Sequence, residues 1–432
     1  MTSSESSSPS PGANAPPSLQ RGEVSAPNAN AIAEETARAA YGRLVAVLAA
    51  RTRDIAAAED ALCDAFAAAL DAWPRSGVPD APEAWLLTAA RRKLIDAARR
   101  AQTRDEAGPA LLLAVEEMQD RSGETFADER LKLLFVCAHP AIDPDMRTPL
   151  MLQTVLGLDA ARIGSAFLVA PATMGQRLVR AKRKIAAAGI PFETPQAEDL
   201  PARVGAVLDA IYAAFGAGYD SPDGADPRAA GLSEEAIYLG SLVAALAPEE
   251  AEAHGLLALM LHIHARREAR RAAGRYVPFD EQDLALWDRR LIARAEMALL
   301  TAAELGNPGR YQFEAAIQSG HAAARLHKID NSAAIVSLYN ALLALAPSTG
   351  AEVGRAAALV KAGRARDALA ALAAVEGERA RRYQPYWATV AHALAADGDV
   401  AGADAAFERA IALSEDAAVR DFLIRRRGAL NA

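Results

Sequence analysis

Residues 158–189 read LDAARIGSAFLVAPATMGQRLVRAKRKIAAAG, and this stretch decides the fold of the segment around it. Asp159 belongs to the residue types that cap helices, and Val169, Ala170 and Pro171 mark a tight turn. The stretch therefore predicts a short helix through Leu168 and a second helix that Thr173 opens. A short helix, a turn and a basic second helix are typical of a helix-turn-helix motif.

The second helix carries two distinct rows of side chains when its residues are placed 100° apart. One row is apolar and should pack on the preceding helices: Met174, Leu178, Ala181 and Ile185. The adjoining row has side chains that reach base edges and phosphates: Thr173, Gln176, Arg177, Arg180 and Lys184. Lys182 and Arg183 flank this row, where they would contact the DNA backbone. The alternative interpretation is a solvated basic helix end.

Positive charge is concentrated on this helix although the chain as a whole is acidic. Residues 171–185 contain five basic side chains and no acidic one, whereas the net charge of the chain is -8. Residues 191–432 hold 25 basic and 32 acidic residues, and residues 31–190 hold 21 of each. Because an acidic surface repels phosphate, any contact with DNA should come from basic patches before residue 190.

The composition predicts an all-α protein. The chain has 432 residues and is 52% hydrophobic, with abundant alanine and no clear alternation of apolar and polar residues. Residues 1–30 have the composition of a disordered tail without a secretory apolar segment. No run of 18 apolar residues is present, so we expect no membrane span. The two cysteines, Cys63 and Cys137, fit a reducing cytoplasm.

Three helices are expected before the linker, the first over about residues 34–50. The second, residues 54–73, has an acidic side with Glu59, Asp60 and Asp64, which is read as a solvated face in the absence of other information. The third, residues 83–101, packs through Trp85 and its apolar neighbours. Its remaining surface carries a basic cluster: Arg91, Arg92, Lys93, Arg99 and Arg100.

In combination, these segments resemble a known family. AEDALCDAFAAALDAWP and PEAWLLTAARRKLIDAARR resemble region two of bacterial RNA polymerase sigma factors of the extracytoplasmic-function class. Residues 128–185, which begin DERLKLLFVCAHP and include the helix-turn-helix stretch, resemble their region four. GAVLDAIYAAFGAGY, LLALMLHIHARREAR and FDEQDLALWDRRLI resemble the subgroup with a long helical carboxy-terminal extension.

The resemblance implies partners for each of these surfaces. Asp60, Asp64 and Phe66 correspond to the surface that docks on the clamp helices of the large subunit of core RNA polymerase. The basic cluster of residues 91–100 corresponds to the part that engages the melting minus-ten promoter element, where an unstacked base is received. The helix from Thr173 to Lys184 corresponds to the reader of the minus-thirty-five element. Cys63–Asp64 departs from the glutamine–glutamate pair that relatives often have there.

The carboxy-terminal half is expected to be a series of helical hairpins. Gly363 and Gly398, Ala368 and Ala403, and Leu372 and Phe407 are each 35 residues apart, close to the tetratricopeptide period. Such a tetratricopeptide-like solenoid would bind a peptide or protein. His262 and His264 lie two apart on a helix and point in different directions, so they predict no metal site. We expect no enzyme activity, catalytic residue, metal or cofactor.

The predicted organisation is a tail (1–30), sigma region two (31–103), a linker (104–126), sigma region four (127–190) and a helical extension (197–432). The predicted function is that of a cytoplasmic sigma factor that recognises promoters and initiates transcription, with an extension that regulates activity or binds a partner. A polymerase-independent helix-turn-helix regulator with a protein-binding helical array is the alternative.

Overall fold

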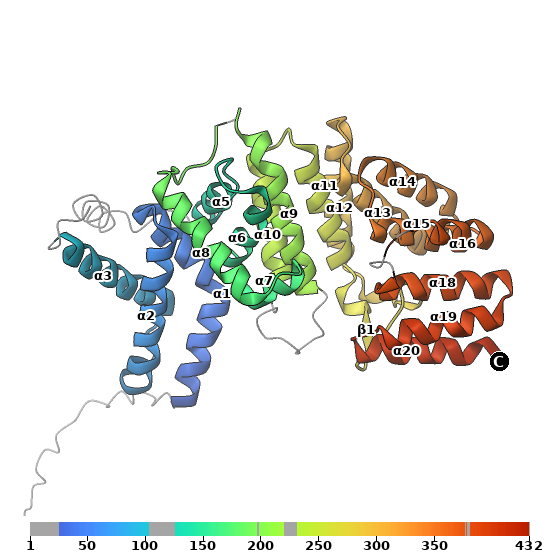
Figure 1. Ribbon diagram of the computed structural model, residues 1–432, viewed down its shortest axis with the longest axis horizontal. Coiled ribbons are helices and arrows are strands. Elements are labelled where there is room, and N and C mark those ends of the chain that lie inside the picture. Colours follow the sequence, from blue (N-terminus) through green and yellow to red (C-terminus); the bar gives the residue numbers. More distant parts are fainter. Residues whose placement is uncertain are drawn as a thin grey trace, which may run out of the picture.

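The computed structural model describes residues 26–102, 126–196, 198–219, 231–375, 377 and 381–431. These residues are helical almost throughout, which confirms the predicted all-α fold (Figure 1). Their strand content is one two-stranded antiparallel hairpin, β1 (Arg271–Ala272) and β2 (Arg275–Tyr276). The predicted tail up to residue 25 and the predicted linker up to residue 125 lie outside the described residues.

Three helices form the amino-terminal part: α1 (Ala26–Thr52), α2 (Ile55–Ser76) and α3 (Pro82–Gln102). Helix α1 begins inside the segment predicted as a disordered tail, so the predicted boundary at residue 30 is wrong. The reason is that Ala29 and Ala33 on its first turns are buried in the core. Helix α2 begins after its cap Asp54 and ends at Gly77, whose φ of 83° suits a glycine.

The next part contains α5 (Phe126–Cys137), α6 (Pro144–Thr154), α7 (Ala160–Ala166) and α8 (Pro171–Ala187). Pro171 was expected in a turn, but it is the first residue of α8, as Pro144 is of α6. Proline fits the first helical turn because its fixed φ is helical and the missing N–H has no partner there.

The third part begins with α9 (Leu200–Tyr219), α10 (Leu232–Leu246) and α11 (Ala251–His264). A strap, residues 265–288, then leads through single 3₁₀ turns and the β-hairpin to α12 (Arg289–Glu304). The 3₁₀ turns are η3 (Arg267–Ala269), η4 (Phe279–Glu281) and η5 (Leu284–Leu286).

The remaining helices form stacked pairs, called the array below. They are α13 (Arg310–His327), α14 (Ser332–Leu345), α15 (Thr349–Lys361), α16 (Ala365–Ala373), α18 (Gln384–Asp397), α19 (Val400–Ala412) and α20 (Ala417–Gly428), followed by η6 (Ala429–Asn431). Gly363, two residues after α15, and Gly398, directly after α18, have φ of 73° and 90°. Leu372 and Phe407 are both 1% exposed. The positions paired by the 35-residue offset therefore have matching environments.

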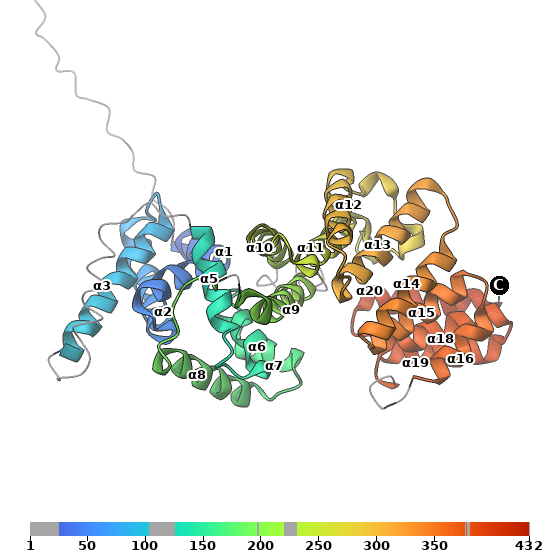
Figure 2. The ribbon, with the colours of Figure 1, turned by 90° about the horizontal axis from the view of Figure 1, so that it is seen from above.

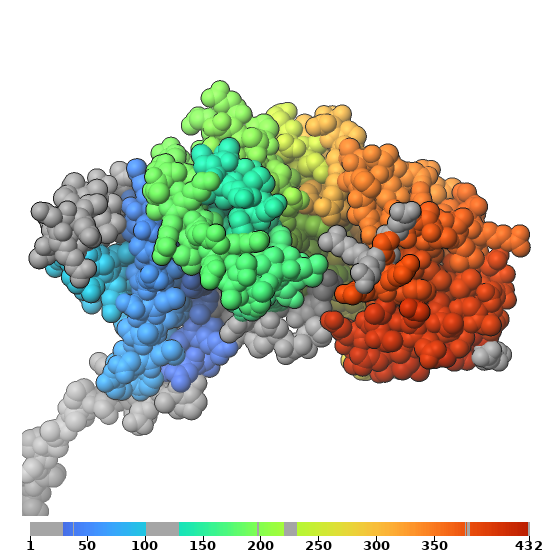
Figure 3. Space-filling view, viewed as in Figure 1, coloured from blue at the N-terminus to red at the C-terminus, as the bar shows by residue number. Residues whose placement is uncertain are grey.

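One hydrophobic core extends from Ala29 in α1 to Ala315 in α13. Figures 1 and 2 show α1–α3 at one end of the long axis and the array at the other, with the remaining helices between them. In the space-filling view, the green surface of α5–α8 lies directly against the blue surface of α1 and α2 (Figure 3). The core therefore continues across residues 190–197, where the sequence analysis placed a domain boundary.

Helix α9 is long and apolar enough to cross a membrane by length and composition, which is weak evidence by itself. Seven of its residues are buried, and they belong to the core shared with α6 and α10. This burial is the pattern of a core helix.

Candidate nucleic-acid interface

The α7–α8 motif has the local geometry that the sequence predicted. Asp159 caps α7, where its carboxylate accepts a hydrogen bond of 2.8 Å from the Arg162 N–H. A Cβ at Gly164 would lie 2.5 Å from the Val169 carbonyl oxygen, so only glycine permits the turn to approach this closely. Helix α7 ends at Ala166, two residues earlier than predicted, and Leu168 in the turn has a φ of 55°.

Helix α8 divides into the two predicted rows. Met174, Leu178, Ala181 and Ile185 are buried in the core. Thr173, Gln176, Arg177, Arg180 and Lys184 are exposed, and so is Arg183. The exposed row therefore presents amide, hydroxyl and cationic groups to solvent from a helix whose other side is fixed by packing.

Lys182 does not lie on that exposed surface. Its side chain is 7% exposed and forms an ion pair with Glu59 of α2, whose side chain is 14% exposed. The prediction that Lys182 contacts the DNA backbone is therefore contradicted in this structure, because its charge is already paired inside the protein. Burial raises the pKa of the Glu59 carboxyl, and the attraction of Lys182 offsets this effect only in part.

The basic cluster of α3 follows one exposed side of the helix. Arg92, Lys93, Arg99 and Arg100 are exposed, whereas Arg91 is half-buried. Burial and the nearby charge of Arg51 both lower the pKa of Arg91. Arg51 of α1 thus joins the cluster, and the sequence analysis missed it because its proximity depends on how α1 packs on α3.

The acidic surface of α2 lies next to the basic cluster. Asp60 and Asp64 are exposed, and Phe66 is half-buried against the core. The Asp64 carboxylate lies 3.5 Å from the Lys93 ammonium group of α3. The surface predicted to bind polymerase and the surface predicted to bind DNA therefore adjoin each other at this ion pair.

Trp73 and Trp85 pack against each other at the junction of α2 and α3. Their ring centroids lie 5.6 Å apart in an edge-to-face arrangement, and Trp73 is 1% exposed. Edge-to-face packing stabilises aromatic pairs in cores. These contacts indicate that the two rings serve packing.

Two residues that hold the amino-terminal helices together were not predicted. Glu59 was grouped with the solvated acids of α2, although its partner Lys182 follows 123 positions later. Gly42 of α1 lies against the end of α6, where a Cβ would come 1.7 Å from the Val155 carbonyl oxygen. A glycine inside a long helical pattern is the one signal that could have indicated such a close approach.

The segment Cys137–His139 has ordinary structural contacts. Cys137 is fully buried, its sulfur lies 3.5 Å from the Thr154 hydroxyl, and burial raises its thiol pKa to about 12. The Nδ1 atom of His139 accepts a hydrogen bond of 3.1 Å from the Ala141 N–H. Both side chains therefore have partners within the fold.

Comparison with known proteins identifies two segments of the chain. Residues 37–104 match the family described as Sigma-70 region 2, and residues 203–303 match a family of unknown function (DUF6596). The "Uncharacterized protein R00370" of Rhizobium meliloti (strain 1021) is 40% identical over 375 residues, which cover 84% of this chain and 88% of the relative. No solved structure matches the chain. Helices α1–α3 therefore coincide with a sigma-70 region 2, which supports a sigma-factor-like role.

Proposed function

Because this chain belongs to the same family as the Rhizobium protein and carries a sigma-70 region 2, we propose that it is a sigma factor of the extracytoplasmic-function class. It binds core RNA polymerase and promoter DNA in the cytoplasm and makes or breaks no covalent bond itself. Its tetratricopeptide-like extension regulates this activity or binds a partner.

The observation that carries the proposal is the pair of separate cationic surfaces on α3 and α8. In α8, the exposed row from Thr173 to Lys184 has the side chains that read a duplex major groove. In α3, the residue 91–100 cluster lies in the segment that matches region 2, where it would follow the backbone of the melting minus-ten element. Two readers on one chain fit the two elements of a promoter.

The acidic surface of α2 supplies the contact with polymerase in this proposal. Asp60 and Asp64 are exposed beside half-buried Phe66, which allows charge pairing around a small apolar contact. A basic surface on the clamp helices would meet it by charge complementarity.

Promoter binding requires α3 and α8 to move apart. The centres of the minus-ten and minus-thirty-five elements lie about 25 base pairs apart, or roughly 85 Å at 3.4 Å per pair. In this structure α3 packs on α2, and α8 contacts α2 as well. A helix as long as α2 spans about 33 Å, well short of this distance. We therefore expect α8 to leave α2, and the Glu59–Lys182 ion pair to break, when both elements are bound.

Transcription with purified components tests the proposal. Core polymerase and the full-length chain are supplied with genomic DNA of the source organism, and the 5′ ends of the RNA are sequenced. We expect a set of start sites that share two upstream motifs, and Asp60→Arg should abolish them. Glu304→Arg, a matched change at an exposed position on α12, should leave them unchanged.

Point variants are preferable to truncation in this test. A chain cut near Pro195 would lose α9, which packs against α5 and α6 in the shared core. If the full-length chain directs no initiation but binds specific duplexes without polymerase, the alternative of an independent helix-turn-helix regulator is correct.

A further inference from the structure

The strap between α11 and α12 lies against the array. Its Phe279 ring packs at 5.6 Å from the His321 ring of α13 and at the same distance from the Trp287 ring. The Lys361 ammonium group of α15 lies 5.8 Å from the centre of the Phe279 ring. Phe279 of the strap thus contacts both α13 and α15, which begin two successive helix pairs of the array.

Polar contacts continue along the same segment. Asp280 pairs with Lys361 of α15 at 2.7 Å, and Glu281 pairs with Arg426 of α20 at 2.6 Å. The Arg325 guanidinium of α13 donates a 2.8 Å hydrogen bond to the Gln282 carbonyl oxygen. The surface of α13, α15 and α20 that makes these contacts is called the inner face below.

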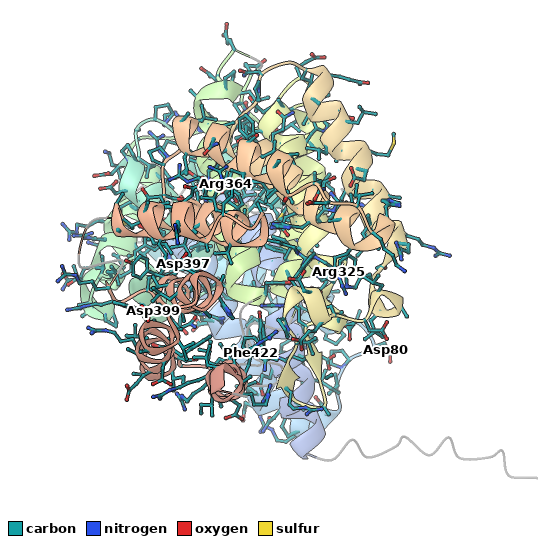
Figure 4. The ribbon with its side chains drawn as sticks, turned by 90° about the vertical axis from the view of Figure 1, so that its right-hand side faces the viewer. Asp80, Arg325, Arg364, Asp397, Asp399 and Phe422 are labelled. Atoms are coloured by element: carbon teal, nitrogen blue, oxygen red, sulfur yellow. The ribbon has the colours of Figure 1, made fainter. Side chains whose placement is uncertain are left out.

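The hairpin of the strap reaches the last helix of the array. Arg271 pairs with Asp416, the cap of α20, at 2.5 Å, and the Tyr276 ring packs at 5.4 Å from Phe422. Figure 4 shows Arg325 and Phe422 beside this segment, with Asp397 and Asp399 farther from it. The array therefore curls so that both of its ends contact one short stretch of chain.

The inner face is cationic and the stretch seated on it is acidic. Arg325, Lys361 and Arg426 face a segment that reads YVPFDEQDL, residues 276–284. This segment holds three carboxylates and no basic side chain. The arrangement is that of a helical array with an extended acidic peptide and one aromatic anchor bound to it.

The ionic contacts of this segment are weak enough to be exchanged. The Asp280 and Glu281 side chains are 63% and 55% exposed, and exposed ion pairs contribute about 0–1 kcal/mol each. Trp287 is 3% exposed and anchors the end of the strap in a small core, and Phe279 and Leu284 pack against the same core. For residues 276–284 to leave the inner face, a partner peptide must therefore replace the apolar contacts of Phe279 and Leu284 as well as the ion pairs.

We propose that the inner face is a docking site for an acidic, aromatic-containing peptide segment of a partner protein, and that the strap occupies it in the absence of the partner. The proposal rests on the proposed role of the extension as a partner-binding part of the chain. Recognition would use an aromatic residue in the place of Phe279 and acidic residues after it, in the places of Asp280 and Glu281.

Tethering makes the strap a strong competitor. A segment held by short connections acts at an effective concentration on the order of millimolar. A free peptide with the same contacts and a Kd of about 100 μM would therefore bind the intact chain about tenfold more weakly than a chain with a released strap.

Fluorescence anisotropy with a labelled YVPFDEQDL peptide tests this proposal on the full-length chain. The strap is released in the triple variant Phe279→Ala, Asp280→Ala, Glu281→Ala. The double variant Asp280→Ala, Glu281→Ala changes only exposed side chains, so it should fold normally. It serves as the second test if the triple variant does not fold. We expect saturable binding to the released chains and at least tenfold weaker binding to the unmodified chain.

Matched changes on the array decide where the peptide binds. Lys361→Glu and Arg426→Glu, each added to the released chain, should weaken binding by about two- to tenfold, because each removes one exposed ion pair and adds a repulsion. Arg366→Glu makes the same charge change on α16, where the side chain is 89% exposed, and should leave binding unchanged. Absence of saturable binding up to about 1 mM, the top of the effective concentration range, would overturn the proposal, as would binding that ignores Lys361→Glu and Arg426→Glu. The assay contains no polymerase or promoter, so it can fail while the sigma-factor function stands.

Discussion

At the scale of single residues, Lys182 and Arg183 show how neighbours on one helix acquire different roles. Both carry a cation, and both were expected to contact DNA. Arg183 is exposed, whereas Lys182 is buried against Glu59. One position along an α-helix turns the side chain by 100°, which here separates solvent from the contact with α2.

Substitutions on α8 should therefore separate stability from DNA binding. Arg177→Ala should weaken binding to a cognate minus-thirty-five duplex by about 1–3 kcal/mol and leave the free energy of unfolding nearly unchanged. Lys182→Ala should lower the free energy of unfolding by about 3 kcal/mol, because it leaves the Glu59 carboxyl buried without its partner. Anisotropy with the duplex and urea unfolding measure the two effects. Equal stability loss in both variants would contradict this division.

Two histidines near the strap should make stability depend on pH. Burial lowers the pKa of His262 to about 4, and burial with the nearby charges of Lys361 and Arg266 lowers the pKa of His321 to about 4. Glu296 and Asp280 oppose these shifts. The unfolded chain binds protons below pH 6.5 and the folded chain does not until about pH 4, so stability falls as pH decreases between these values.

The expected loss between pH 7 and 5 is about 2 kcal/mol per histidine. Urea unfolding at pH 7, 6 and 5 measures it, and His321→Asn should reduce the dependence relative to the unmodified chain. The predicted direction would be wrong if the free energy of unfolding of the unmodified chain rose on acidification and that of His321→Asn did not.

At the scale of elements, close approach of backbones fixes how α1 packs on α6. The Cβ-free position Gly42 lets α1 lie against the Val155 carbonyl, and Gly164 permits the turn between α7 and α8. Both glycines lie within helices, where alanine would be preferred by about 1 kcal/mol if packing did not intervene. Packing between elements therefore overrides local preference at these positions.

Glycine-to-alanine substitution should have opposite effects on stability at two helical positions, Gly42 and Gly205. Gly42→Ala should lower the free energy of unfolding by about 1–3 kcal/mol, because the new methyl group forces a backbone shift. Gly205→Ala on α9, where a Cβ meets nothing within 4 Å, should raise it by up to about 1 kcal/mol. Chemical denaturation of both variants checks the contrast, and equal stabilisation by the two changes would refute the packing argument.

At the scale of the whole molecule, the two parts proposed to read the promoter are joined to each other and to the extension. Arg130 of α5 pairs with Glu235 of α10, and Arg162 donates a 3.2 Å hydrogen bond to the Ala217 carbonyl of α9. The extension thus contacts the helices around α8. A change in the extension can therefore alter how α8 is held against α2.

Charge reversal across the α2–α8 contact should open the molecule. Glu59→Lys places two cations in one buried contact, so α8 should leave α2 and the radius of gyration in small-angle X-ray scattering should increase. The double variant Glu59→Lys, Lys182→Glu should restore the compact form because attraction is restored. An unchanged radius in the folded single variant would contradict the role of this pair as the contact that closes the molecule.

The amino-acid sequence by itself determined the helical fold, the helix-turn-helix and its two rows, because these depend on residues close together in the chain. Helix periodicity, capping by Asp159 and proline in first turns act locally, and the structure agrees with them except at several helix ends. Only the tertiary structure decided that Lys182 is paired with Glu59, that Arg51 joins Arg91, and that the strap occupies the inner face of the array. Each of these contacts joins residues that are tens of positions or more apart, and no local preference encodes which distant side chain will lie opposite.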